Sequence, residues 1–419
     1  MKKYSFLLVA ALFLGACASP PKPIVNPTPD NAEVLPQQLL SNELTDGYYR
    51  TLLPIVSSPA RGLVYNHLGS GQGRRGNSFD IEELELSLMR NSQRFFDPEE
   101  LYFQEGQQLE RGEVSQLLGR QLTSYQQQRI PNRLDWGQNP PGPQTYQDGV
   151  ETVEVDEGDL IITIGDQLFR SRDVIHLAFL VEQNFIAVDS DGNNQLEGIS
   201  LGLALSPYQM MDSEVNGTPI TVSRRIPDSE LLAVGREMAN QILGIIRDEI
   251  GGQQDRSDLG SVPIMIGLYI LESNDTVVPG RMAEVGLASR NSTEIRSWET
   301  VRETHLLLHD NRILEYDTDL MDEYNHFYNV IATQYPHFHG IVGTAFFMDG
   351  RLHSVEITIN VEFLGLAEKL SMHQLVGTLV GEIFSQRYDV TVVLRNSREI
   401  YGVVTRQQNQ DVFIHRIGW

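Results

Sequence analysis

The chain has very little cysteine: Cys17 is the only one among 419 residues. A single thiol cannot form an internal disulfide bond or a cysteine-rich metal site. If a lipid is attached to Cys17, its thiol cannot serve as a catalytic nucleophile either. We predict no metal and no cofactor, and the sequence identifies no catalytic residue.

Positive charge is scarce as well. The chain has 32 Lys and Arg residues against 56 Asp and Glu residues, which gives a formal net charge of −24. Such an acidic surface disfavours binding to nucleic acid and electrostatic adhesion to anionic lipids. We therefore expect no nucleic-acid partner, and attachment to a membrane would need another kind of anchor.

Long apolar runs are missing except near the amino end, where Phe6–Leu14 forms one. Lys2 and Lys3 precede this run and two small residues follow it, which is the order of a secretory signal peptide. As a helix, residues 4–16 would span roughly 20 Å at about 1.5 Å per residue, which is short of the roughly 30 Å of a bilayer core. We therefore predict a cleavable signal peptide over residues 1–16 and not a transmembrane helix.

Cys17 ends a pattern that is typical of a lipobox, Leu14-Gly15-Ala16-Cys17. In this pattern a signal peptidase cuts between Ala16 and Cys17, and the cysteine then carries S-diacylglycerol and N-palmitoyl groups. The alternative is an ordinary signal peptide that happens to end near a cysteine. With the lipid as anchor, the chain would be bound to the bilayer at the extracellular face of the cell membrane. Residues 17–40 are rich in proline and predict an unstructured tether, which leaves residues 41–419 for the globular body.

Helices in the body are predicted from apolar spacing and from signals at their ends. Asp80-Ile-Glu-Glu83 resembles a capping box, and apolar residues follow at helical spacing until Asp97-Pro98 ends the run. Asp228 begins a second helix that ends at Gly251-Gly252. Further helices are expected over residues 321–334 and 371–384.

Strand signals are equally plain. Apolar and polar residues alternate over Val355–Phe363, which is the pattern of a sheet with one wet face. Asp349-Gly350 predicts a hairpin turn that joins this strand to another over residues 344–348. Other strands are expected over residues 200–205, 264–271, 390–394 and 412–417. Hairpins mixed with long helices predict an α+β fold of largely antiparallel sheets packed with several amphipathic helices.

Between residues 131 and 159 these patterns give way to Pro, Gly, Gln and acidic residues. Such a composition favours either a long surface loop or a boundary that divides the body into two lobes. Both interpretations stay open.

Three short motifs match functional patterns only in part. Gly71–Gly76 reads G-x-G-x-x-G, but its glycines do not open a helix, so we expect a loop and not a nucleotide site. Ser200 lies in a G-x-S-x-G pattern, but turn residues precede it and a strand follows it, the reverse of a nucleophile elbow. Asp189–Asn193 lacks the later glycine and glutamate of a calcium loop, so a hairpin turn is favoured.

Two groups of side chains are candidates for hydrolase chemistry. The histidines are His305, His309, His326, His337 and His339. His337 and His339 would share one face of a strand, but a zinc site needs a third ligand, so exposed histidines are favoured. The acids are Asp317, Asp319, Asp322 and Glu323. They gather near a helix start, where capping is the stronger interpretation.

Eight segments along the body resemble those of the CamS family, the sex-pheromone-precursor lipoproteins of Gram-positive bacteria. They are Asp46-Gly-Tyr-Tyr-Arg50, Ala60-Arg-Gly-Leu-Val-Tyr65, Phe103-Gln-Glu-Gly106, Leu180-Val-Glu-Gln183, Gly202-Leu-Ala-Leu205, Pro263-Ile-Met-Ile-Gly-Leu-Tyr269, Val278-Pro-Gly280 and Gly340-Ile-Val-Gly343. Their order and their spread over most of the chain carry the resemblance. It implies a membrane lipoprotein, and a short apolar peptide cut from the end of the signal sequence.

The stretch of this chain that matches such a peptide is Ala10-Ala11-Leu12-Phe13-Leu14-Gly15-Ala16. It keeps the apolar body, the central Phe13 and the small last residue of the family pattern, and it departs from that pattern at Gly15 and Ala16. The alternative, which we favour, is that the stretch is only the apolar part of a signal peptide.

For the mature body the sequence predicts a binding protein that is not an enzyme, with a peptide or cell-surface ligand of unknown identity. The alternative is an extracellular cell-wall hydrolase that uses carboxylates or histidines. An enzyme needs converging polar groups, whereas a binding protein can present an apolar or aromatic groove. Candidate groove residues, for which core packing is the alternative, are Tyr48, Tyr49, Tyr65, Tyr102 and Phe103.

Overall fold

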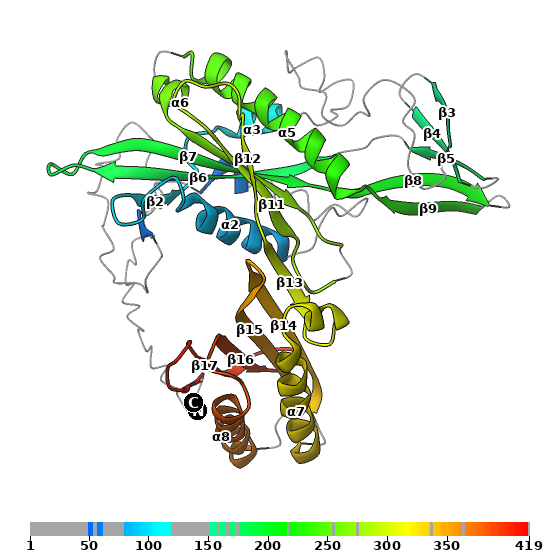
Figure 1. The fold of residues 1–419 in the computed structure, drawn as a ribbon, viewed down its shortest axis with the longest axis vertical. Helices are drawn as coiled ribbons and strands as arrows, with labels where there is room; N and C mark the ends of the chain where they lie inside the picture. The colour runs from blue at the N-terminus through cyan, green and yellow to red at the C-terminus, as the bar shows by residue number, and fades with distance from the viewer. Residues whose placement is uncertain are drawn as a thin grey trace, which may run out of the picture. The chain divides into compact units, whose positions relative to one another are not determined.

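The computed structural model describes most of the globular body, and the structural statements below refer to the described residues. These are residues 49–52, 57–61, 79–118, 151–156, 159–164, 167–171, 176–215, 218–253, 256–273, 276–335, 338–362 and 365–417. Their strands form three sheets (Figure 1).

The first sheet has seven strands in the order β1-β2-β6-β7-β10-β11-β12. Their bounds are Arg50–Thr51, Tyr102–Glu105, Leu177–Val188, Asn194–Leu205, Ile264–Ile270, Arg281–Ala288 and Trp298–Thr300. β6 and β7 form a long antiparallel hairpin, whereas β7 and β10 run parallel. A parallel pair needs a long crossover connection, and here it contains helix α5 (Asp228–Gly244).

Helices cover both faces of this sheet. α2 (Phe79–Ser92) packs on one face, where Leu84 joins a buried cluster with Phe185 of β6. Gly202 of β7 permits this close packing, because a Cβ atom there would lie 2.7 Å from Leu84. The elements that bury apolar residues on the opposite face are α3 (Arg111–Leu117), α5, the π-helix η2 (Ile245–Ile250) and α6 (Ser257–Ser261). Since both faces are covered, β10 is buried along its whole length and consists almost entirely of apolar residues.

The second sheet has five strands in the order β3-β4-β5-β8-β9. Their bounds are Glu151–Asp156, Asp159–Ile164, Gln167–Ser171, Tyr208–Val215 and Thr218–Arg225. Every neighbouring pair in this sheet is antiparallel.

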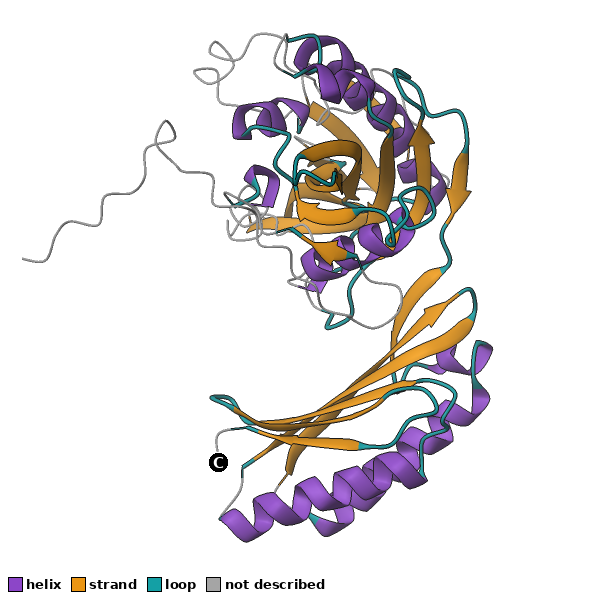
Figure 2. Cartoon of the chain, turned by 90° about the vertical axis from the view of Figure 1, so that its left-hand side faces the viewer, coloured by secondary structure: helices purple, strands orange, loops and turns teal. Residues whose placement is uncertain are grey.

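The third sheet has six strands in the order β13-β14-β15-β16-β17-β18. Their bounds are Glu303–Leu307, Phe338–Met348, Arg351–Val361, Asp389–Arg395, Ile400–Arg406 and Phe413–Arg416. Helices α7 (Thr318–Gln334) and α8 (Leu366–Glu382) lie along one face of this sheet and share one buried apolar cluster with it (Figure 2). The short 3₁₀ helix η3 (Asn311–Glu315) leads from β13 into α7.

The predicted α+β class is confirmed. The helices expected from Asp80 and Asp228 are α2 and α5, the latter continued by η2. The predicted hairpin joins β14 and β15, and Asp349 and Gly350 adopt φ values of 51° and 76°. Two successive positive φ values are what the commonest two-residue hairpin turn requires. A lobe boundary near residues 131–159 stays a prediction, because residues 119–150 lie outside the described part of the chain.

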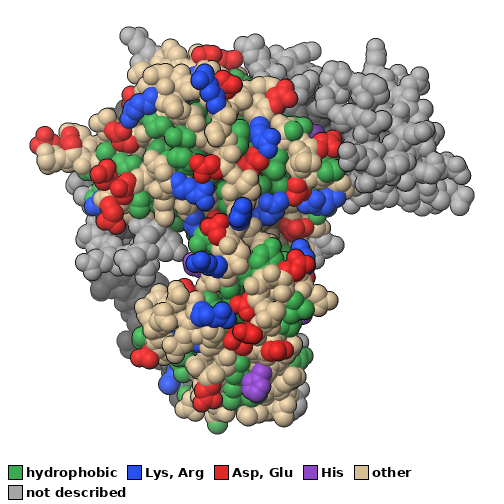
Figure 3. Space-filling model, viewed as in Figure 1, with side chains coloured by type: hydrophobic (Ala, Val, Ile, Leu, Met, Phe, Trp, Pro, Cys, Tyr) green, Lys and Arg blue, Asp and Glu red, His purple; other side chains and the backbone are tan. Residues whose placement is uncertain are grey.

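On one face of the molecule, charged side chains of both signs are dispersed. On the face in Figure 3, the blue Lys and Arg side chains alternate with the red Asp and Glu side chains over the described part of the molecule. On this face the excess of negative charge is therefore not gathered into one acidic patch.

Candidate functional site

Several sequence-predicted residues lie outside the described part of the chain. They are the peptide Ala10–Ala16, Cys17, the Gly71–Gly76 motif, Tyr48, Tyr65 and His337. His339 lies in β14, but its side chain is not described. The structure therefore does not test these predictions.

The serine and calcium motifs take their expected structural roles. Ser200 is fully buried inside β7, and its Oγ lies 2.7 Å from the Oγ of Ser92 on α2. It therefore lies on a strand and not on a strand-to-helix turn. Asp189 begins the β6–β7 hairpin turn, and its Oδ1 accepts hydrogen bonds from the backbone nitrogens of Asp191 and Asn193 at 2.9 and 2.8 Å. This confirms the predicted turn.

The acids near residue 320 have structural partners. Asp317 is the N-cap of α7, and its Oδ1 accepts hydrogen bonds from the backbone nitrogens of Asp319 and Leu320. Glu323 accepts hydrogen bonds from the Tyr388 hydroxyl and from the backbone nitrogen of Ser385. The capping interpretation is thus confirmed for Asp317.

The aromatic candidates divide between core and surface. Tyr49 is buried, and its hydroxyl donates a 2.5 Å hydrogen bond to the carbonyl oxygen of Phe96. The guanidinium of Arg50 lies over the ring of Tyr102, and its central carbon is 4.3 Å from the ring centroid. Phe103, the next residue on β2, lines a cavity of about 180 Å³. Of the described aromatic candidates, Phe103 is therefore the one that borders a possible ligand site.

We call this cavity the Arg61 pocket. Its lining residues are Ser58, Arg61, Glu85, Leu86, Met89, Phe103, Glu105, Val181, Glu182 and Gln183. They come from a helical turn at residues 59–61 and its approach, from α2, from β2 and from β6. The pocket thus joins four segments that are separate in the sequence.

Charge in the pocket centres on Arg61. Its guanidinium lies 3.4 Å from a carboxylate oxygen of Glu85 and 3.2 Å from one of Glu105. Burial raises the pKa of Glu85 to about 7, although Arg61 acts to lower it; Glu105 and Glu82 raise it further. Near neutral pH, the protonation of Glu85 therefore depends on the charged groups around it, which are Arg61, Glu105 and Glu82.

Glu182 forms part of the pocket wall but points its carboxylate into the protein. Its oxygens accept hydrogen bonds from the backbone nitrogens of Gln108 and Leu109 at 2.8 and 3.0 Å. Burial raises its pKa to about 7, and these hydrogen bonds oppose the rise. This carboxylate therefore fixes the segment between β2 and α3.

Gln183 lines the pocket and has an unused acceptor that lies below the accessible surface. Its Nε2 donates a 2.7 Å hydrogen bond to the backbone carbonyl of Glu85, which fixes the orientation of the amide. The residue is 2% exposed, and its Oε1 is buried with no hydrogen-bond donor. A buried acceptor without a donor costs free energy, so a donor on a ligand would be favoured there.

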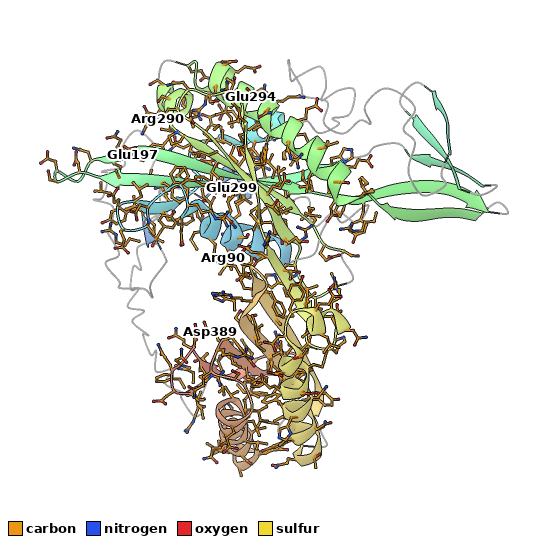
Figure 4. The ribbon with its side chains drawn as sticks, in the orientation of Figure 1. Arg90, Glu197, Arg290, Glu294, Glu299 and Asp389 are labelled. Atoms are coloured by element: carbon orange, nitrogen blue, oxygen red, sulfur yellow. The ribbon has the colours of Figure 1, made fainter. Side chains whose placement is uncertain are left out.

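The arginine of α2, Arg90, forms a different arrangement, which we call the Arg90 cluster. Arg90 donates to Glu83 on its own helix and, at 2.9 Å, to Glu303 on β13. Glu303 also accepts hydrogen bonds from Ser87 at 2.5 Å and from Asn91 at 3.1 Å. Figure 4 labels Arg90 on the side of α2 that faces β14 and β15, and its guanidinium lies 4.8 Å from the ring centroid of Phe346 on β14.

His305 borders the Arg90 cluster and packs against an aromatic side chain. Its ring stacks on Phe346 at a centroid distance of 4.5 Å, and its Nε2 lies 3.7 Å from Glu83. Burial and the neighbouring Arg90 lower its pKa to about 4, so it is neutral near pH 7. A neutral ring stacked on an aromatic side chain is a packing element.

A larger cavity of about 370 Å³ lies against β16, β17 and β18. Its charged residues already have partners: Asp389 accepts a hydrogen bond from the backbone nitrogen of Gln408, and the Arg406 guanidinium donates to backbone carbonyls at the end of α8. A cation at a helix carboxyl end is a stabilising arrangement. The polar groups of this cavity therefore serve the fold.

The described residues contain no group of three or more His, Cys, Asp or Glu side chains arranged to hold a metal ion. They also contain no helix that is long and apolar enough to cross a membrane.

Sequence reasoning missed Arg61, Glu85 and Gln183. One signal was present: Glu182-Gln183-Asn184 interrupts the apolar sequence of β6, in a part of the strand that is buried. Polar residues inside a buried strand need partners or a function. By contrast, nothing local indicated that Arg61 would meet Glu85 and Glu105.

Comparison with known proteins gives the same family as the sequence segments. Residues 57–412 match the family of the CamS sex pheromone cAM373 precursor. No curated protein matches the chain. The fold is similar to that of a sex pheromone precursor from Lactobacillus salivarius subsp. salivarius UCC118, with a TM-score of 0.69, 19% identity, and coverage of 91% of this chain and 99% of that one. It is also similar to the C-terminal domain of the sex pheromone staph-cAM373 precursor from Staphylococcus aureus, with a TM-score of 0.59, 18% identity, and coverage of 82% and 98%. Since the family match spans most of the chain, this protein belongs to the CamS family of sex pheromone precursors.

Proposed function

We propose that the chain is a lipoprotein, anchored by lipid on Cys17 at the extracellular face of the cell membrane. The lipobox pattern Leu14–Cys17 supports this, and so does membership of a family of pheromone precursors. Ala10–Ala16 would be the last part of the signal peptide that the cut removes, and we propose that it is released as a short pheromone-like peptide.

Mass spectrometry of the chain extracted from membranes tests the anchor. The expected first residue is Cys17, with S-diacylglycerol and N-palmitoyl groups. A Cys17→Ala variant is the control and should carry no lipid. Recovery of a wild-type chain that still begins before Cys17, or that begins there without lipid, would contradict the proposal.

Two measurements test the peptide. The heptapeptide Ala10–Ala16 should be detectable in the culture medium of cells that express the chain, and its synthetic form should trigger a response in pheromone-sensing recipient cells. A Phe13→Ala peptide is the matched control and should be weaker, because the central aromatic side chain is lost. A silent wild-type peptide would leave the segment as part of a signal sequence only.

We further propose that the body is a binding protein and not an enzyme. The Arg61 pocket carries this proposal, because it combines apolar wall residues with a buried acceptor, Gln183 Oε1, that has no donor. The cell-wall hydrolase, which would use carboxylates or histidines, receives no such support, since Asp317 caps α7, Asp319 is exposed and His305 stacks on Phe346.

Blocking the pocket tests this proposal. Leu86 lines the pocket and is 37% exposed, so Leu86→Trp should close the mouth without disturbing the core. Leu314 on η3 is 48% exposed and does not line the pocket, so Leu314→Trp is the matched control. Calorimetry with the full-length chain in lipid nanodiscs should detect binding of short apolar peptides to wild type and to Leu314→Trp, but not to Leu86→Trp. Equal binding by all three chains would exclude the pocket.

A further inference from the structure

The polar groups of the Arg61 pocket are mostly acceptors. Among the described lining residues, Glu85 and Glu105 bring carboxylates, Gln183 brings an amide oxygen without a donor, and Arg61 alone carries a positive charge. Two carboxylates against one guanidinium leave an excess of negative charge when both are ionised. A ligand with N–H donors and a positive charge complements this set, whereas a carboxylate ligand would be repelled.

The rest of the lining is apolar and the space is small. Leu86, Met89, Phe103 and Val181 supply hydrocarbon and aromatic surface around a volume of about 180 Å³. Pockets for drug-sized ligands usually start at about 300 Å³. The cavity therefore has room for one apolar side chain and its charged group, and the remainder of a longer ligand would stay outside.

We propose that the Arg61 pocket binds the positively charged amino end of an apolar peptide. The first side chain of the peptide occupies the apolar part of the cavity, and its ammonium group pairs with Glu85 and Glu105 at the surface of the pocket. The same group donates to Gln183 Oε1, which the empty pocket keeps buried, when the Gln183 side chain turns toward the ligand. This rests on the proposed binding function of the body, and it does not depend on whether the chain releases Ala10–Ala16.

The geometry explains why each group is needed. Arg61 holds the two carboxylates near each other, because it lies within 3.4 Å of Glu85 and 3.2 Å of Glu105. Gln183 is linked to the same place through its hydrogen bond to the Glu85 backbone carbonyl. On binding, the ammonium group would lose its hydrogen bonds to water and gain one buried acceptor and two carboxylates. A charge that is buried needs such replacement partners.

Three soluble probes separate the amine from the apolar side chain. They are Leu-Gly-Ala amide, its N-acetyl form, and Ala-Gly-Ala amide, each titrated into the full-length chain in nanodiscs. Leu-Gly-Ala amide should bind most tightly. Acetylation should weaken binding at least tenfold, because it removes the charge, and the smaller alanine should weaken it several-fold, because it leaves apolar surface exposed.

Variants of the chain assign the contacts. Gln183→Met keeps the size of the side chain but removes the acceptor, and Glu85→Gln removes the charge; each should weaken Leu-Gly-Ala amide about tenfold and leave the weak binding of the acetylated probe unchanged. Glu197→Gln is the matched control, because Glu197 pairs with Arg290 and does not line the pocket (Figure 4). Circular dichroism checks that each variant is folded.

The pH profile gives a readout that loss of folding cannot imitate. Glu85 faces Arg61, Glu105 and Glu82, and its pKa of about 7 means that its charge is lost as the pH falls below 7. A peptide amino group loses its own charge above about pH 8. Affinity should therefore peak between these values and fall about tenfold from pH 7.5 to pH 5.5, and the fall on the acidic side should be absent in Glu85→Gln.

The outcomes are distinct. If Leu-Gly-Ala amide and its acetylated form bind equally, the body binds peptides but does not recognise the amine, and this inference is wrong. If neither probe binds although Leu86→Trp abolishes binding of longer peptides, the binding function stands and the amino-end assignment fails. If no peptide binds at all, both proposals fail together.

Discussion

Helix α2 contributes to two arrangements of one arginine between two glutamates, and these arrangements differ in solvent exposure. In the Arg90 cluster the side chains of Arg90 and Glu303 are 26% and 5% exposed. In the Arg61 pocket the side chains of Arg61 and Glu105 are 36% and 39% exposed. The first arrangement is sealed between α2 and the β13–β15 strands, and the second opens to a cavity.

Helical geometry explains why the two arrangements lie apart. Glu83 and Glu85 are two positions apart, which places them about 200° apart around an α-helix. Ser87, Arg90 and Asn91 follow the stripe of Glu83, whereas Met89 follows that of Glu85. The third stripe, with Leu84, packs on the sheet. One helix therefore serves the core, a buried polar network and a pocket.

The two arrangements also differ in which of their buried polar atoms have hydrogen-bond partners. Glu303 accepts donors from Ser87, Arg90 and Asn91, so its carboxylate is well satisfied. In the Arg61 pocket, Gln183 Oε1 has no donor. In the Arg90 cluster the atom left without a partner is a donor, Arg90 Nε, whereas in the pocket it is an acceptor, which a donor on a ligand could pair.

Breaking the Arg90 cluster should give the largest effect on stability. Arg90→Met leaves Glu83 and Glu303 buried without a positive partner, and removing one member of a buried charge pair costs about 3–5 kcal/mol. Urea denaturation should show this loss. The control is Arg94→Met, whose pair with Glu299 is largely exposed and whose loss should cost about 0.5 kcal/mol or less.

A second substitution tells loss of charge balance from loss of packing. Adding Glu303→Gln to Arg90→Met removes one uncompensated charge and should restore part of the stability. If the double variant is no more stable than Arg90→Met, the cost comes from lost packing against Phe346, and the electrostatic account of the cluster is wrong.

The next largest effect is a pH dependence at Glu85. Its pKa in the folded chain is raised from 4.5 to about 7 by burial, so the folded state holds a proton that the unfolded state releases. This contribution to stability is fully present below about pH 4.5 and is lost as the pH rises through 7. At pH 8, Glu85→Gln should therefore be more stable than wild type, by at most roughly 3 kcal/mol.

The comparison between low and high pH is the measurement. At pH 4.5 wild type and Glu85→Gln should have similar free energies of unfolding, and the difference should grow up to pH 8. Glu299→Gln, which removes an exposed carboxylate, should give a constant difference. A Glu85→Gln variant that loses stability with rising pH as steeply as wild type would show that Glu85 is already ionised at pH 4.5.

Local signals in the sequence were sufficient for many elements of the fold. Asp349-Gly350 predicted the β14–β15 hairpin because its positive φ values are a property of the two turn residues themselves. Asp317 was assigned to a helix start because capping depends on its nearest neighbours. Similarly, the spacing of apolar residues after Asp228 predicted α5, because that spacing is set by the helix.

The candidate site could not be predicted in the same way. Arg61 and Glu105 are 44 positions apart, and Ser87 and Glu303 are 216 positions apart. Helical spacing places Glu83 and Glu85 on different sides of α2, but only the tertiary structure brings β13 to one side and β2 to the other. The sequence therefore shows which residues are charged, but it does not show which of them pair.

The smallest effect distinguishes the two arrangements most directly. Arg61 lowers the pKa of Glu85, and Glu105 raises it. Arg61→Met should thus raise the Glu85 pKa above 7, and Glu105→Gln should lower it below 7, as followed by the carboxyl carbon signal of Glu85 in an NMR titration. Because Arg61 is partly exposed, its loss should cost about 1 kcal/mol or less.

Arg90→Met is the matched comparison for this titration. Arg90 acts on Glu83, whereas Arg61, Glu105 and Glu82 act on Glu85. If the two arrangements are independent, Arg90→Met should leave the Glu85 pKa unchanged in conditions where the variant is folded. A shift as large as that in Arg61→Met would mean that α2 couples the Arg90 cluster to the Arg61 pocket. A change in the Arg90 cluster would then alter the ligand affinity of the pocket.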